Sequence, residues 1–197
     1  ELPAAAALET RVFIREYADH VINSPNEPGI AYFMGAGCFR LPEPGSEAAR
    51  ALERMREMAR RRNAQVMQRV NEHLGSVKLD YEADVLLLTP SGNATERHLL
   101  AAFDARARQV YPDREGLAKF WSAALSVPEP DASALVADEV KLQEMIRSKL
   151  MKFGGVGYVA PTPESFPQVE TVIGMVQDIE ALPTATWLDG TNPGELD

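Results

Sequence analysis

The chain has 197 residues, of which 45% are apolar and 25% are charged, a composition typical of a folded globular domain and not of a disordered one. Its 20 basic residues are outnumbered by 29 acidic ones, and the formal charge of −9 argues against nucleic acid as a partner. The single cysteine excludes a disulfide framework, and no run approaches the roughly 20 apolar residues that a membrane span needs. Because no signal peptide opens the sequence either, we expect a cytoplasmic protein without a membrane partner.

Two extended segments are predicted near the start of the chain, in residues 9–39. The run RVFIREY at 11–17 alternates in part and is rich in β-branched and aromatic residues, which predicts a strand. The turn-forming stretch NSPNEPG at 23–29 then precedes the apolar run IAYFM at 30–34, which predicts a buried strand. These two strands are expected to form a long hairpin or to be neighbours in one sheet.

Helices are predicted over residues 46–152. A long helix follows Pro44-Gly45 and ends at Gly75, because apolar residues between them recur at near-helical spacing. Shorter helices follow, and the last of them runs towards Lys152. The residues predicted to cap these helices are Ser46, Asp80, Thr95, Asp113 and either Asp131 or Ser133.

The last section, residues 153–197, returns to a strand. A glycine-rich crossing leads to a helix whose apolar residues include Val169, Val172 and Val176, and a strand is predicted at 182–188. The order of helix then strand favours parallel pairing. We therefore predict one α/β domain, incomplete in this chain, with residues 1–45 and 153–197 forming a sheet and residues 46–152 a helical insertion.

Motifs for nucleotide binding are weak or absent. Gly35 and Gly37 follow a strand, but Arg40 stands where a dinucleotide-binding motif needs a glycine, so a tight turn is the better interpretation. The sequence contains neither a P-loop nor a GxSxG motif. Cys38 is expected to be a buried structural residue and not a nucleophile.

One pair of residues does suggest a binding site. His98 and Arg97 fall in the first turn of a predicted helix, where two cationic groups are unfavourable unless an anion binds there. The other histidines, His20 and His73, are expected at a surface and at a helix end. A dense arginine cluster at 54–69 is expected to be a solvated helix with salt links, and the alternative is a patch facing phosphate.

Four stretches in order resemble the PHP (polymerase and histidinol phosphatase) superfamily, in its small phosphoesterase branch. The segment RRRNAQVMQRVNEHLGSVKLDYEADVLLL is similar to a helix of that branch, and ERHLLAAF at 96–103 resembles its Arg-Pro-His motif. The remaining two are IAYFMGAG, which resembles a strand end, and GGVGYVAPTPESFPQVETVIGMVQDIEALPTATW, which resembles the returning helix and strand.

This resemblance implies part of a distorted, TIM-like β/α barrel with a large helical insertion. It implies a metal-dependent hydrolase acting on phosphate esters, with divalent Mn, Fe or Zn and a small phosphorylated substrate. By the same resemblance Arg97 and His98 would bind the substrate, and Glu9 would be a metal ligand, with Glu16 as its rival.

Departures from the family pattern motivate an alternative. Tyr32 or Phe33 stands where the family has a strand histidine, and Trp187 and Leu188 replace an Ala-His-Pro segment. The alternatives are therefore a degenerate PHP-like domain that binds a ligand or partner without catalysis, and a helical interaction module. Since the chain starts at Glu1 and not at Met, we expect a piece of a longer protein. Substrate, metal and oligomeric state stay open.

Overall fold

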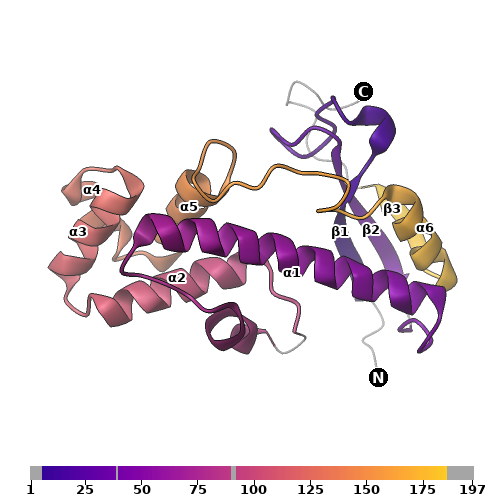
Figure 1. Cartoon of the computed structure of the whole chain (residues 1–197), viewed down its shortest axis with the longest axis horizontal. Helices are drawn as coiled ribbons and strands as arrows, with labels where there is room; N and C mark the ends of the chain where they lie inside the picture. The colour runs from indigo at the N-terminus through magenta and orange to yellow at the C-terminus, as the bar shows by residue number, and fades with distance from the viewer. Residues whose placement is uncertain (1–5, 39, 90–91, 186–197) are drawn as a thin grey trace. The chain divides into compact units, whose positions relative to one another are not determined.

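The computed structural model describes residues 6–38, 40–89 and 92–185 of the chain (Figure 1). Within these ranges the chain forms three strands and six α-helices, joined by short 3-10 and π-helical turns. It divides into two units, which we call the sheet unit (residues 1–59 and 160–197) and the helical unit (60–159). The division falls inside helix α1 (Glu47–Leu74).

The sheet unit contains a small antiparallel sheet of order β1-β2-β3. Its strands are β1 (Ala6–Phe13), β2 (Ile30–Cys38) and β3 (Leu182–Ala185). The central strand β2 pairs antiparallel with both neighbours, for example with Ala31 opposite Val12 and Gly35 opposite Pro183.

Helix α6 (Val169–Asp178) covers the sheet (Figure 1). Its buried residues Val172, Met175 and Val176 join Val12 and Phe33 of the strands in one apolar cluster. Gly35 makes the close approach feasible, because a Cβ at that position would lie 2.9 Å from Cγ2 of Val176. The first part of α1 adds Ala48, Ala51 and Met55 to the same cluster, so two helical segments and one small sheet hold the sheet unit together.

The predicted TIM-like barrel is wrong for the described residues, and so is the predicted parallel pairing. A parallel pair needs a crossover that returns the chain to the same end of the sheet. Here residues 14–29 fold back on themselves, with Asn26 and Gly29 at positive φ, and β2 therefore runs opposite to β1, in agreement with the hairpin predicted for this section. Strand β3 likewise runs opposite to β2. The result is a mixed fold that is mostly helical.

The first strand also ends earlier than predicted. Beyond Phe13 the backbone leaves the strand, and Arg15–Tyr17 forms the exposed 3-10 turn η1. The N–H of Phe13 donates to the carbonyl oxygen of Pro167 at 2.8 Å, so a different segment takes up the edge of β1 there. The second predicted strand, in contrast, continues four residues further, to Cys38.

The helical unit holds the remaining helices. Asp80 and Asp113 are confirmed as capping residues, since their side chains accept from the N–H groups of Ala83 and Gly116 at 2.8 and 2.7 Å. The single helix predicted towards Lys152 is wrong, because Asp138 caps a new helix there. The elements are η2 (Tyr81–Val85), η3 (Leu86–Leu88), α2 (Glu96–Val110), α3 (Arg114–Leu125), α4 (Glu129–Leu135), α5 (Glu139–Ile146) and η4 (Arg147–Met151).

One apolar core stabilises the helical unit. Trp121 and Phe103 are fully buried, and they lie in a cluster with residues of the C-terminal half of α1 such as Val70. Burial of side chains of this size stabilises a fold by about 1.5–3 kcal/mol each. Among the described residues, no helix is both long enough and apolar enough to cross a bilayer.

Candidate functional site at the start of helix α2

Helix α2 begins with a capping box that contains one of the predicted site residues. Thr95 is the N-cap residue and His98 is the third residue of the helix. The backbone N–H of Thr95 donates to Nδ1 of His98 at 3.0 Å, and Oγ1 of Thr95 lies 2.9 Å from the same atom. Because Nδ1 accepts, the ring hydrogen of the neutral imidazole sits on Nε2. His98 therefore has a structural role in starting the helix.

Unpaired hydrogen-bond donors gather at this helix start. Arg97 is exposed, and its guanidinium has no hydrogen-bond or ion-pair partner among the described residues. The same holds for Nε2 of His98 and for the backbone N–H groups of Glu96 and Arg97, the first two of the helix. Such N–H groups carry the positive end of the helix dipole. The arrangement offers several donors to an anion.

The loop before α2 is anchored by two hydrogen bonds, one of them buried. Nδ2 of Asn63, on α1, donates to the carbonyl oxygen of Ala94 at 2.8 Å. The N–H of Asn93 donates to Oγ1 of Thr89 at 3.1 Å. Asn63 also reaches Tyr81, whose pKa is raised by burial, with the hydrogen bond from Asn63 opposing the shift. These contacts fix the chain just ahead of Thr95.

Further charges lie beside the first turn. Glu96 accepts from Nζ of Lys152 at 3.0 Å and pairs with Nε of Arg147 at 3.5 Å. Both bases come from the segment at and just after η4 (Arg147–Met151). With Arg97 they make three basic groups against one carboxylate, so the start of α2 carries a local excess of positive charge. This excess sits on a protein whose overall charge is −9.

The predicted metal ligand and the predicted substrate-binding pair belong to different units. Glu9 is exposed on β1 in the sheet unit, opposite Met34, whereas Arg97 and His98 belong to the helical unit. Tyr32 lies on β2, where its N–H donates to Oδ1 of Asn23. Trp187 and Leu188 lie outside the described residues.

The described residues do not fit the multinuclear metal site that the resemblance implies. Across residues 6–38, 40–89 and 92–185 there is no group of three or more histidine, cysteine, aspartate or glutamate side chains placed to hold an ion. A catalytic metal is held by about three converging protein ligands. We therefore derive no metal-dependent step from these residues.

The cysteine and the other two histidines make contacts within the chain that explain their positions without a ligand. Cys38 is buried and its thiol donates to the carbonyl oxygen of Gly35 at 3.4 Å. Nε2 of His73 lies 2.8 Å from the carbonyl oxygen of Ala124. His20 is exposed and packs edge-to-face with Tyr17.

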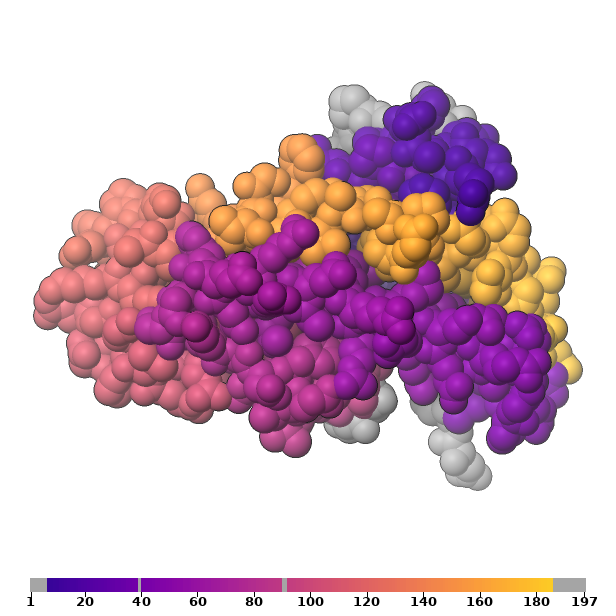
Figure 2. All heavy atoms as spheres, viewed as in Figure 1, coloured from indigo at the N-terminus to yellow at the C-terminus, as the bar shows by residue number. Residues whose placement is uncertain are grey.

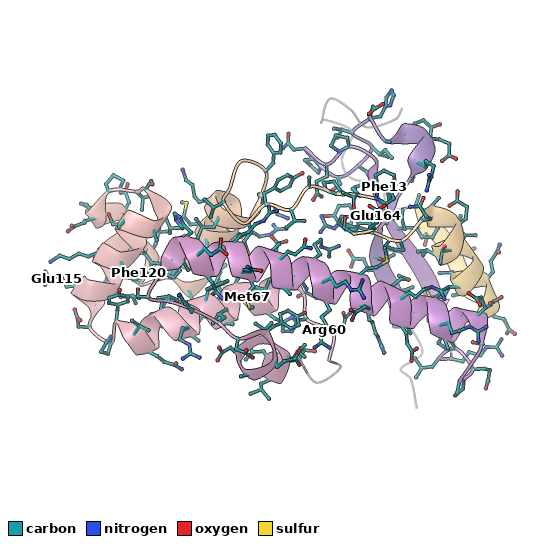
Figure 3. The ribbon with its side chains drawn as sticks, in the orientation of Figure 1. Phe13, Arg60, Met67, Glu115, Phe120 and Glu164 are labelled. Carbon is teal, nitrogen blue, oxygen red and sulfur yellow. The ribbon has the colours of Figure 1, made fainter. Side chains whose placement is uncertain are left out.

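Most arginines of α1 make ion pairs or hydrogen bonds within the chain. The outer side of this helix lies at the molecular surface in Figure 2. Arg60, which is labelled in Figure 3, pairs with Glu82 and lies over the ring of Tyr81. Arg69 donates to the carbonyl oxygen of Tyr158. These contacts agree with the interpretation of a solvated helix with salt links.

Sequence reasoning missed the residues that support the site. Asn63 is not among the predicted residues, although it falls four residues before Met67 and seven before Val70 on the buried stripe of α1. A polar residue on an apolar stripe indicates a buried hydrogen bond, and that signal was present. The pairing of Glu96 with Arg147 and Lys152 had no local signal, because about 50 residues separate the partners.

Comparisons with protein-family models, with curated proteins and with solved structures found no match for this chain. The resemblance to the PHP superfamily therefore stays a prediction from the sequence.

Proposed function

We propose that the helical unit binds the phosphate group of a small phosphate ester at the start of helix α2. The observation that carries this proposal is the set of unpaired donors there: the guanidinium of Arg97, Nε2–H of His98 and two backbone N–H groups. Phosphate oxygens accept several hydrogen bonds at once, and the N-terminus of a helix favours a negative charge.

The surrounding charges support an anion over a neutral group. Arg147 and Lys152 share the single carboxylate of Glu96, so that carboxylate is already engaged by two cations. A planar guanidinium such as that of Arg97 can donate two parallel hydrogen bonds to one phosphate. The anchored loop at Ala94 holds the helix start in place before the ligand arrives, which reduces the entropy lost on binding.

A titration with phenyl phosphate, followed by ¹H–¹⁵N NMR in buffer with EDTA, tests the proposal. We expect saturable shifts in the amides of residues 95–98 and no such shifts with phenol. Arg97→Ala should weaken binding about tenfold, which corresponds to about 1.4 kcal/mol. Arg56→Ala is the matched control, because Arg56 is also exposed on a helix and has no partner among the described residues. Equal affinities of the two variants would contradict the proposal.

Hydrolysis of the bound ester is the second candidate function. It is favoured by His98, which falls on the histidine of the family's Arg-Pro-His motif, with Arg97 beside it in place of the proline. It ranks second because the described residues do not supply the clustered metal ligands that this chemistry needs. Release of p-nitrophenol from its phosphate ester, measured with Mn²⁺ and with EDTA, separates the two functions. Mn²⁺-dependent release that falls in Arg97→Ala supports hydrolysis, and binding without release leaves a binding domain.

A further inference from the structure

A pocket lies at the C-terminal end of helix α2. This pocket, of about 310 Å³ and open to solvent, is lined by residues at the end of α2, at the start of α3 and just after α4. Its volume falls at the lower end of the range of small-molecule sites. The 15 residues of α2 place this pocket roughly 20 Å along the helix from the phosphate site proposed above.

Two arginines line this pocket, and protein carbonyls hold both in place. Arg108 donates to Asp104 at 2.8 Å and to the carbonyl oxygen of Val136 at 3.3 Å. Arg114 donates to the carbonyl oxygen of Ser133 at 3.2 Å. Arg108 is thus neutralised by a carboxylate, whereas Arg114 pairs with no carboxylate among the described residues. The pocket carries one uncompensated guanidinium, fixed by the backbone.

The rest of the wall is apolar. Leu117 and Val136 contribute buried aliphatic side chains, and Pro112 lies between the two helices. Tyr111 stacks on Phe120 of α3, labelled in Figure 3, with ring centroids 4.8 Å apart. Its hydroxyl lies 2.8 Å from Oγ of Ser76, so the ring is held at both ends. The aromatic and aliphatic walls suit the hydrocarbon part of a ligand.

We propose that this pocket binds a small organic acid, with its carboxylate on Arg114 and its apolar body against Leu117 and Val136. A singly charged carboxylate balances the one uncompensated guanidinium. A phosphate dianion would add a second negative charge close to Asp113, whose carboxylate caps α3 beside the pocket. Charge matching therefore favours a carboxylate ligand over a phosphate ligand here.

Paired titrations with benzoate and benzamide, which share shape but differ in charge, test this inference by ¹H–¹⁵N NMR. We expect saturable shifts of the amides of residues 108–117 with benzoate, and at least tenfold weaker binding of benzamide. Arg114→Ala should weaken benzoate binding at least fivefold. Lys119→Ala is the matched control on the same helix, since Lys119 pairs with Glu115 outside the pocket, and it should change the affinity less than twofold.

Arg114 is the residue to change because it is exposed, whereas removal of Arg108 would strand the buried carboxylate of Asp104. Equal binding of benzoate and benzamide, shifts that do not saturate, or an unchanged affinity in Arg114→Ala would each overturn the proposal. Arg97→Ala should leave benzoate binding unchanged. The two sites can therefore fail or succeed separately.

Discussion

Asn63 and Ala94 are 31 residues apart in the sequence and are joined by a buried hydrogen bond of 2.8 Å from Nδ2 of Asn63 to the carbonyl oxygen of Ala94. The bond ties the long helix α1 to the residue that precedes the N-cap of α2. A buried carbonyl oxygen without a partner costs roughly 1–3 kcal/mol. The hydrogen bond from Asn63 therefore helps to hold the start of α2, where the phosphate site is proposed.

Asn63→Ala should reduce both stability and phosphate binding. We expect the free energy of unfolding in urea to fall by about 1–3 kcal/mol, because the Ala94 carbonyl loses its donor. Phenyl phosphate should bind several-fold more weakly, since the start of α2 is less well held. Asn71→Ala is the control: Asn71 makes two hydrogen bonds to the backbone of Leu79, so its loss should destabilise without weakening binding. Similar binding by the two variants would contradict this prediction.

Substitutions of His98 separate its capping role from its proposed binding role. Glutamine at the third helix position accepts from the N-cap N–H as the imidazole does, so His98→Gln should change stability by less than about 0.5 kcal/mol. His98→Ala removes the cap and should cost about 1 kcal/mol. The side-chain amide of glutamine keeps an N–H donor, whereas alanine has none, so His98→Ala should bind phenyl phosphate more weakly and His98→Gln should bind it nearly as well as the parent chain. If His98→Ala binds phenyl phosphate as well as the parent chain, His98 acts through the cap alone.

Stability should depend on pH through Asp104. Its side chain is only 3% exposed, and burial raises its pKa above the ordinary value of 3.8, with Arg108 opposing the shift. The folded state then holds the proton more tightly than the unfolded state. The stability due to Asp104 is full below pH 3.8 and is lost as the pH rises through the raised pKa. The unfolding free energy of the parent chain minus that of Asp104→Asn should therefore fall as the pH is increased from below 3.8 through the raised pKa.

Asp138 offers a control of opposite sign. It is partly exposed, and hydrogen bonds from Lys141 lower its pKa below 3.8. Its contribution is present above pH 3.8 and is lost as the pH falls through the lowered pKa. The difference between the parent chain and Asp138→Asn should accordingly rise with pH. Urea titrations of the three proteins at a series of pH values measure both differences in unfolding free energy. If the difference between the parent chain and Asp104→Asn stays constant or rises with pH, the prediction for Asp104 is wrong.

Two glycines of the sheet unit should respond in opposite directions to alanine. At Gly35 a Cβ would lie 2.9 and 3.2 Å from the two γ-methyl groups of Val176, so Gly35→Ala should cost about 1–3 kcal/mol. Gly174, within α6, has no atom within 4 Å of a built Cβ. Gly174→Ala should stabilise by up to about 1 kcal/mol, because alanine favours the helix. Thermal unfolding of both variants tests this, and a stabilising Gly35→Ala would show that α6 does not pack on β2 as described.

Local chemistry in the sequence determined where most helices begin. Asp80 and Asp113 cap helical turns as predicted, because a carboxylate that accepts from N–H groups three residues later needs only its neighbours. The extended run at 30–34 and the long helix ending near Gly75 are also confirmed, because an apolar run and a helical spacing are likewise local features of the sequence. The predicted cap at Thr95 is confirmed as well, and it puts Arg97 and His98 in the first turn of α2.

Only the tertiary structure decided the direction of the strands and the surroundings of the sites. Strand β2 runs antiparallel to β3 although 143 residues separate Cys38 from Leu182, and no periodicity in either strand encodes that choice. The predicted barrel failed at this step. Local sequence likewise does not encode the contact of Asn63 with Ala94, nor the partners of the two arginines of the pocket. These partners meet through packing between distant segments, whose free energy depends on the whole core and not on local sequence.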